Sequence, residues 1–144
     1  MIEKQWDMRR FALISLSLMG LIMVYLLQRE IQHFFSTFGL SGYQLFIAGR
    51  SFRFIVNDLL MILLIYGLYM KRKYVIFAFY LQLIGIILIL IPYLVIKYNT
   101  PYNGPLVSFL HRLVINPLLM VLLIPAFFYQ ERYSEIETTK NDTK

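Results

Sequence analysis

Long apolar runs alternate with short polar segments along most of this chain. The runs predict four membrane-spanning helices, at about residues 11–28, 46–70, 74–96 and 105–128. Each run is long enough to cross the hydrocarbon core, which takes about 17–25 residues in a helix. We therefore expect an all-α integral membrane protein with a single four-helix membrane domain at 1–130. The polar segment 131–144 is expected to form a frayed or disordered cytoplasmic tail.

Three prolines predict local features of the last two spans. Proline lacks an N–H and clashes with the carbonyl four residues earlier, so Pro92 should kink or fray the end of the third helix. Proline is favoured in the first helical turn, so the fourth helix should begin at Pro105. Within that helix, Pro117 leaves the carbonyl of Leu113 without its usual partner.

The segment between the first two spans is rich in aromatic residues: Phe34, Phe35, Phe38, Tyr43 and Phe46. Aromatic side chains favour the membrane–water interface. One interpretation is a short interfacial helix or re-entrant piece that lies over the helix bundle. The other is an irregular loop whose aromatic side chains pack on the helix ends.

Composition agrees with a membrane location, because 59% of the residues are hydrophobic and only 15% are charged. Soluble domains have about 45–50% apolar and about 25% charged residues. The chain has no cysteine, which excludes disulfides, thiol nucleophiles and cysteine metal ligands. The formal net charge is +6, but the basic residues flank apolar runs, so we assign them to topology and anionic lipid rather than to nucleic acid.

Arginine and lysine residues orient the spans. If the N-terminus is cytoplasmic, nine of these residues lie on the cytoplasmic side and four lie on or near the outer side. The positive-inside rule favours this arrangement. Both termini should therefore be cytoplasmic.

The stretch RFIVNDLLMILLI, which begins at Arg53, is echoed 59 residues later by RLVINPLLMVLLI, which begins at Arg112. Eight of the thirteen positions are identical, and the shared Arg and Asn are informative because both are rare inside spans. The echo is either a two-fold pseudo-repeat of a helical hairpin about an axis along the membrane normal, or convergence on one helix design. In both cases the two helices should hold their Arg and Asn at similar depth.

Polar side chains form a stripe on each of these two helices. The stripes are Arg50, Arg53 and Asn57 on the second span and Ser108, Arg112 and Asn116 on the fourth. A spacing of three or four residues places each set on one helix face. Asp58 lies one position beyond its stripe, about 100° further round the helix. His111 flanks the other stripe.

These stripes supply the candidate site, because charged groups inside a span are costly unless they pair or reach water. We expect a polar cluster between the second and fourth spans that comprises Arg53, Asn57, Asp58, His111, Arg112 and Asn116. The expected ion pair joins Arg112 to Asp58. The cluster is either an outward-facing pocket for a carboxylate or phosphate, or a polar clamp that fixes helix packing. We expect no catalytic residue, no metal site and no cofactor.

Three stretches carry a resemblance to a known family: RFIVNDLLMILLIYGLY, KYVIFAFYLQLIG and YNGPLVSFLHRLVINPLLMVLLIPAFFYQ. In these stretches, which cover most of residues 53–130, the chain resembles the exosortase F system-associated membrane proteins of Bacteroidetes. The resemblance implies a multi-pass protein of the bacterial inner (plasma) membrane, encoded beside an exosortase that processes C-terminal sorting signals on exported proteins. It also implies that the exosortase uses a cysteine, which this chain lacks.

Two functions follow from the residues and the resemblance together. The first is a non-enzymatic membrane accessory protein of an exosortase-type protein-sorting system. The alternative is a small membrane enzyme or carrier that binds an anionic lipid-linked or peptide group. The expected partners are the lipid bilayer, an exosortase or its substrates, and further copies of this chain; no nucleic-acid partner is expected.

Overall fold

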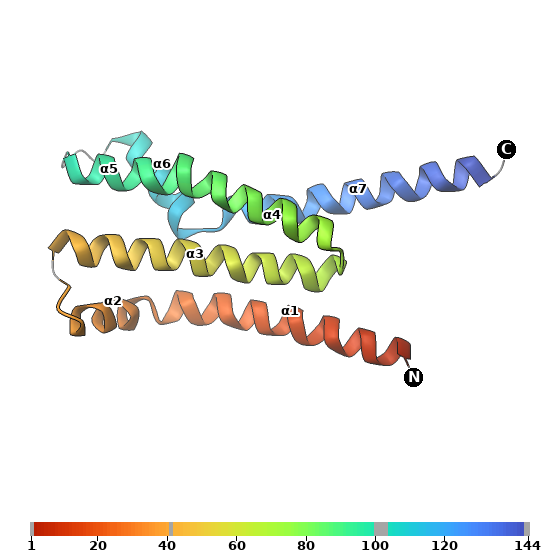
Figure 1. Ribbon diagram of the computed structural model, residues 1–144, viewed down its shortest axis with the longest axis horizontal. Coiled ribbons are helices and arrows are strands. Elements are labelled where there is room, and N and C mark those ends of the chain that lie inside the picture. Colours follow the sequence, from red (N-terminus) through yellow and green to blue (C-terminus); the bar gives the residue numbers. More distant parts are fainter. Residues whose placement is uncertain (1, 41, 100–103, 143–144) are drawn as a thin grey trace.

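The computed structural model describes residues 2–40, 42–99 and 104–142, and all the regular structure in these ranges is helical. The helices are α1 (Ile2–Leu26), α2 (Gln28–Thr37), α3 (Gly42–Tyr69), α4 (Arg72–Gly85), a π-helical segment (Ile86–Leu90), α5 (Ile91–Asn99), α6 (Pro105–Ile115) and α7 (Leu118–Asp142) (Figure 1). The all-α class is therefore confirmed. As expected, the helix that follows the third loop begins at Pro105.

Three stretches of helix are long and apolar enough to cross a membrane: Asp7–Leu26, Gly42–Tyr69 and Arg72–Asn99. A fourth candidate is the pair Pro105–Val114 and Leu118–Ser134, whose two helices are bent by 64°. Along α1 only 6% of the most apolar window is buried within the protein. Large apolar side chains so exposed require lipid around them, and the helices thus indicate a membrane protein.

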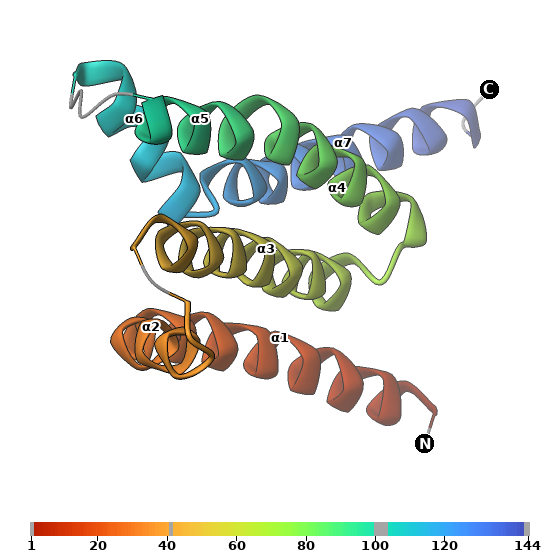
Figure 2. The same cartoon turned by 60° about the vertical axis from the view of Figure 1, so that its left-hand side comes forward.

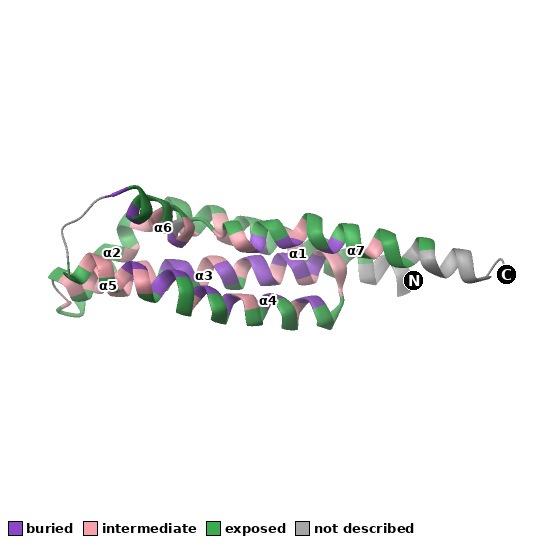
Figure 3. Ribbon diagram, turned by 90° about the horizontal axis from the view of Figure 1, so that it is seen from above, coloured by how far each residue is buried: buried purple, intermediate pink, exposed green. Residues whose placement is uncertain are grey.

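Helix α3 is the centre of the molecule, with α1 and α2 on one side and α4 to α7 on the other (Figures 1 and 2). Buried residues concentrate along α3, as Figure 3 shows. One core cluster includes Ile65, Tyr74 and Met120 and joins α3, α4 and α7. A second cluster includes Phe54 and Tyr93 and joins α3 to α5 and α6. Helix α1 begins and α7 ends at the same end of the molecule (Figure 1).

Pro92 distorts the third apolar run without ending it. The π-helical segment Ile86–Leu90 lies directly before it, and the helix continues to Asn99. The ring of Pro92 would clash with the carbonyl of Leu88, and a π-helical turn widens the helix at this position. The expected distortion is present, but the helical span is longer than the range 74–96.

The fourth apolar run is broken in its middle, where we expected one helix at 105–128. The N–H of Asn116 still bonds to the Arg112 carbonyl at 3.0 Å, but the backbone of Asn116 is extended (φ −105°, ψ 132°) and a new helix begins at Leu118. A residue that precedes proline is driven out of the helical region, so Pro117 imposes this break. The break places Asn116 at a bend between two helices.

The aromatic segment and the C-terminal segment are both largely helical. The first part of the aromatic segment lies in a short helix, α2. The side chains of Phe34, within α2, and of Phe38, directly after it, are exposed. This excludes a wholly irregular loop. Residues 131–142 are helical, where we expected a frayed or disordered tail, because α7 continues to Asp142.

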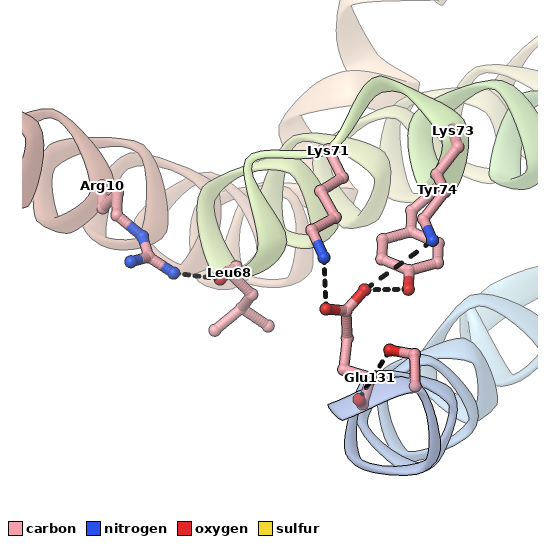
Figure 4. Close-up of polar contacts among 7 residues, drawn as sticks. Arg10, Leu68, Lys71, Lys73, Tyr74 and Glu131 are labelled. Atoms are coloured by element: carbon pink, nitrogen blue, oxygen red, sulfur yellow. Dashed lines mark hydrogen bonds and ion pairs between the residues drawn. The ribbon is translucent and has the colours of Figure 1, made fainter. Parts of the chain in front are cut away.

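Glu131 anchors α7 to the turn between α3 and α4. Its carboxylate accepts hydrogen bonds from the Lys71 ammonium and the Tyr74 hydroxyl, and the Lys73 ammonium lies 3.9 Å away (Figure 4). Beside it, the Arg10 guanidinium donates to the Leu68 carbonyl at 2.6 Å and ties α1 to the end of α3. These contacts lie at the end of the molecule where the chain begins and ends, opposite the candidate site.

Candidate functional site

The two polar stripes line common cavities at the end of the molecule where α3 and α6 begin. A cavity of about 380 Å³, which we call the basic cavity, is lined by Arg50, Lys97, Ser108, His111 and Arg112, together with Phe46, Tyr93 and Val107. These residues come from α3, α5 and α6. The cavity therefore joins the outer turns of both stripes with a lysine from α5.

Aromatic side chains contact Arg50 and His111 in the basic cavity. The Arg50 guanidinium lies over the ring of Phe46, 5.6 Å from its centroid. The His111 Nδ1 atom lies 2.7 Å from the hydroxyl of Tyr93, a side chain that is 1% exposed. Holding these groups in place lowers the entropy that binding a ligand would cost.

The charged residues that line this cavity are basic. No acidic side chain lines it, and the ion pairs in the described part of the chain all involve Glu131, at the other end of the molecule. The buried Nε of Arg50 has no hydrogen-bond partner among the described residues. A buried donor without a partner is costly, so a bound anion would stabilise this arrangement.

A second hollow, which we call the lateral cavity, lies deeper along the same stripes and has a volume of about 230 Å³. Its polar lining is Gln28, Arg53, Asn57 and Asn116. The rest of its lining is mostly apolar and comprises Leu21, Val24 and Tyr25 of α1, Met61 of α3, Pro117, and Val121 of α7. The structure thus brings together Arg53, Asn57 and Asn116 from the predicted cluster.

Arg53 is buried, with 7% of the residue exposed. Its Nε donates to the Gly49 carbonyl at 3.2 Å, and its Nη1 donates to Oε1 of Gln28 at 3.1 Å. These bonds come from two sides, α3 and α2, and they orient the guanidinium at the wall of the lateral cavity. Its Nη2 makes no hydrogen bond to the described residues, which leaves one edge of the guanidinium available.

Asp58 lies apart from both cavities, and the expected ion pair with Arg112 is wrong. Asp58 is buried at 5% exposure, whereas Arg112 is exposed in the basic cavity. One turn earlier on the same face of α3, the Ile55 carbonyl accepts a bond from Nε2 of Gln82 at 3.5 Å. Asp58 lies about 100° from the stripe, so its side chain leaves α3 on a different face from Asn57.

The two echoed sequences differ in how they use their shared residues. Asn57 and Asn116 line the same cavity, as equal depth predicts. Arg112, however, shares the basic cavity with Arg50 rather than with Arg53. The echo also diverges at the position after the asparagine, where Asp58 continues a helix and Pro117 breaks one.

The predicted cluster omitted Arg50, Lys97 and Tyr93, which line the basic cavity. Lys97 and Tyr93 come from the end of the third span, which packs beside α6 only in the tertiary structure. A signal was present for Lys97, because antiparallel spans place the end of the third beside the start of the fourth. Tyr93 had no such signal, since a tyrosine near a span end is ordinary.

The side chains that line the basic cavity have the chemistry of an anion site. Guanidinium, ammonium and imidazole groups are the usual ligands of phosphate and carboxylate. No group of three or more His, Cys, Asp or Glu side chains that could hold a metal is found among the described residues.

Comparison of the chain with protein-family models, curated proteins and solved structures finds no match.

Proposed function

We propose that this chain is a non-enzymatic membrane protein that holds an anionic group, a phosphate or a carboxylate, in the basic cavity. One observation carries the proposal: Arg50, Lys97, His111 and Arg112 line one cavity in which the described residues provide no acidic counter-charge. Placing several cations together is unfavourable without an anion between them. A cavity built to bind an anion explains why they converge.

The proposed topology has four spans, counting α6 and α7 as one broken span, with both termini in the cytoplasm. The excess of Lys and Arg near the termini and the α3–α4 turn supports this orientation, as does the position of both chain ends at one end of the molecule (Figure 1). The basic cavity then opens toward the outer face of the bacterial inner membrane. Reactivity of a cysteine introduced at Leu106 toward an impermeant maleimide on intact cells would test this orientation.

The proposed setting is an exosortase-type protein-sorting system, in which this chain acts as an accessory. This part of the proposal is supported by the resemblance of residues 53–130 to exosortase F system-associated proteins. An accessory would assemble with the exosortase or present its substrate, without carrying the thiol itself. Co-purification with the exosortase in mild detergent would support this role, and normal sorting after deletion of this chain would contradict it.

A second candidate is an enzyme or carrier that acts on an anionic lipid-linked or peptide group. The contact between Tyr93 and His111 favours it, because a hydroxyl bonded to an imidazole at a cavity wall could move a proton. For an enzyme, Tyr93→Phe should abolish turnover even when the ligand is saturating. For an accessory, the same variant should only weaken ligand binding and should still support sorting when the substrate is abundant.

Anion binding itself is tested by thermal unfolding of the full chain in detergent with added glycerol 3-phosphate. A ligand that binds only the folded protein raises its unfolding temperature. We expect this rise for the wild type and its loss in Arg112→Gln. The matched control is Arg132→Gln, an exposed arginine of α7 outside the cavity. An equal rise in all three proteins would contradict the proposal.

A further inference from the structure

The basic and lateral cavities follow one another along the same two helices. Arg50 and Arg53 line successive cavities and lie three residues apart, about 4.5 Å along α3. On the other stripe, Arg112 lines the basic cavity and Asn116 lines the lateral cavity, about 6 Å further along the helix axis. The two cavities are therefore neighbours along α3, about one helical turn apart.

The lining changes from charged to apolar along this path. The basic cavity has three cationic groups and one imidazole, whereas the lateral cavity has Arg53 and three amides at one side. Beyond them its walls are apolar and include Leu21 and Val24 of α1 and Val121 of α7. Such a gradient matches a molecule with an anionic head and an apolar chain.

The lateral cavity is lined by helices that also carry exposed apolar side chains. Its walls α1 and α7 both pack on α3 and do not form an extensive interface with each other. The neighbours of its wall residues, Met23 on α1 and Leu122 on α7, are 55% and 64% exposed. Apolar side chains so exposed on spanning helices face the bilayer, so a molecule that entered between α1 and α7 would come from the hydrocarbon.

Arg53 lies at the polar side of the lateral cavity, where the anionic head and the apolar chain of a lipid would meet. It is a buried cation with two of its nitrogens held by Gly49 and Gln28 and with Nη2 unbonded among the described residues. An arginine retained inside a span marks a ligand path by default. Its available edge points to a phosphate or carboxylate oxygen as the bonding partner.

We propose that the ligand of the basic cavity is an anionic membrane lipid, which enters sideways between α1 and α7. Its phosphate or carboxylate head binds Arg50, Arg112 and Arg53, and its apolar chain lies in the lateral cavity. This inference rests on the proposed anion-binding function and names the class of ligand.

The test measures binding of two probes to the full chain in nanodiscs. One probe is phosphatidic acid in phosphatidylcholine, and the other is soluble glycerol 3-phosphate, which has the same phosphate head without a chain. Val24→Trp and Val121→Trp fill the lateral cavity from opposite walls. Met23→Trp and Leu122→Trp are their controls, since each adds the same ring at the adjacent, lipid-facing position.

We expect each cavity-filling variant to weaken phosphatidic acid binding by about tenfold or more, because the chain loses its site and the head is displaced from charged donors. The same variants should bind glycerol 3-phosphate as the wild type does, and both controls should bind both probes normally. If variants on two different helices both lose phosphatidic acid binding and keep glycerol 3-phosphate binding, the loss comes from the filled cavity and not from misfolding of one variant.

The remaining outcomes overturn one proposal or the other. If the cavity-filling variants bind phosphatidic acid like the wild type, the lateral path is wrong. If the wild type binds glycerol 3-phosphate as tightly as phosphatidic acid, the ligand is a soluble anion and only the anion-binding function stands. If neither probe binds the wild type, the proposed function itself fails.

Discussion

The hydroxyl of Tyr93 and the Nδ1 of His111 lie 2.7 Å apart and join α5 to α6 at the wall of the basic cavity. Tyr93 is 1% exposed and its ring also packs against Phe46, with 6.1 Å between centroids. The tyrosine is therefore a fixed support, and the imidazole is positioned by it. Among the described residues, the hydrogen bond that orients the His111 ring is the one to Tyr93.

Tyr93→Phe removes that bond and retains the buried ring. We expect the free energy of unfolding to fall by about 1 kcal/mol, the usual contribution of one hydrogen bond. Affinity for glycerol 3-phosphate should also fall, because His111 is no longer held. Denaturant unfolding in detergent and a binding titration measure the two effects. Tyr98→Phe, at an exposed tyrosine of α5, is the control and should change neither.

The packing of α1 on α3 depends on two glycines with different surroundings. A Cβ at Gly67 would lie 3.2 Å from the Cβ of Leu13 and 3.3 Å from the backbone nitrogen of Ile14. A Cβ at Gly20 would meet only the flexible end of the Leu60 side chain, at 2.7 Å. Small residues let spanning helices approach closely, and only the contact at Gly67 is with atoms that cannot move aside.

We therefore expect Gly67→Ala to destabilise the protein by about 1–3 kcal/mol, as overpacking does. Gly20→Ala should be close to neutral, because Leu60 can change rotamer and alanine favours the helix by up to about 1 kcal/mol. Thermal unfolding of both variants in the same detergent makes the comparison. A larger loss for Gly20→Ala would contradict this account of the α1–α3 contact.

Pro117 sets the bend between α6 and α7. Pro117→Ala restores the missing N–H and removes the clash with the Leu113 carbonyl, so the two helices should become more nearly continuous. The distance between spin labels at Leu106 and Tyr129, both exposed, should lengthen toward the roughly 35 Å of a straight helix. The chain has no cysteine, so Leu106→Cys and Tyr129→Cys can be labelled cleanly for double electron–electron resonance.

Pro125→Ala serves as the control for that measurement, because Pro125 lies within α7 and away from the break. It should leave the label distance unchanged. An unchanged distance in Pro117→Ala would mean that packing, rather than the proline, imposes the bend.

Glu131→Gln tests the anchor of α7. The substitution removes the charge that pairs with Lys71 and Lys73 and keeps an oxygen for the Tyr74 hydroxyl. The pair is near the surface, so we expect a small drop in unfolding temperature that disappears at high salt. A drop that persists at high salt would show that the carboxylate acts through a buried contact instead.

Much of the helical framework could be predicted from apolar run lengths and from Pro105, which begins α6 as expected. The break at Pro117 could also have been predicted, since Asn116 precedes a proline and must leave the helical region. The length of α7 could not, because its anchor Glu131 contacts Lys71 and Tyr74, which are distant in sequence.

The site was predicted only in part, and for a geometric reason. Residues on one helix face could be grouped by spacing, which correctly placed Asn57 and Asn116 on stripes that meet. The residues that face one another across two helices depend on the rotation and tilt of each helix. Sequence spacing does not determine that rotation and tilt. The pairing of Asp58 with Arg112 failed at this step, and Tyr93 was missed because α5 reaches α6 only through tertiary packing.

The central claim is that the stripes of α3 and α6 converge on one anion. A double-mutant cycle tests it directly: glycerol 3-phosphate binding is titrated calorimetrically into the wild type, Arg50→Gln, Arg112→Gln and the double variant. If both arginines hold the same phosphate, the two losses in binding free energy should not add, with a coupling of about 0.5–3 kcal/mol. Losses that add within experimental error, or no loss in either single variant, would contradict the claim.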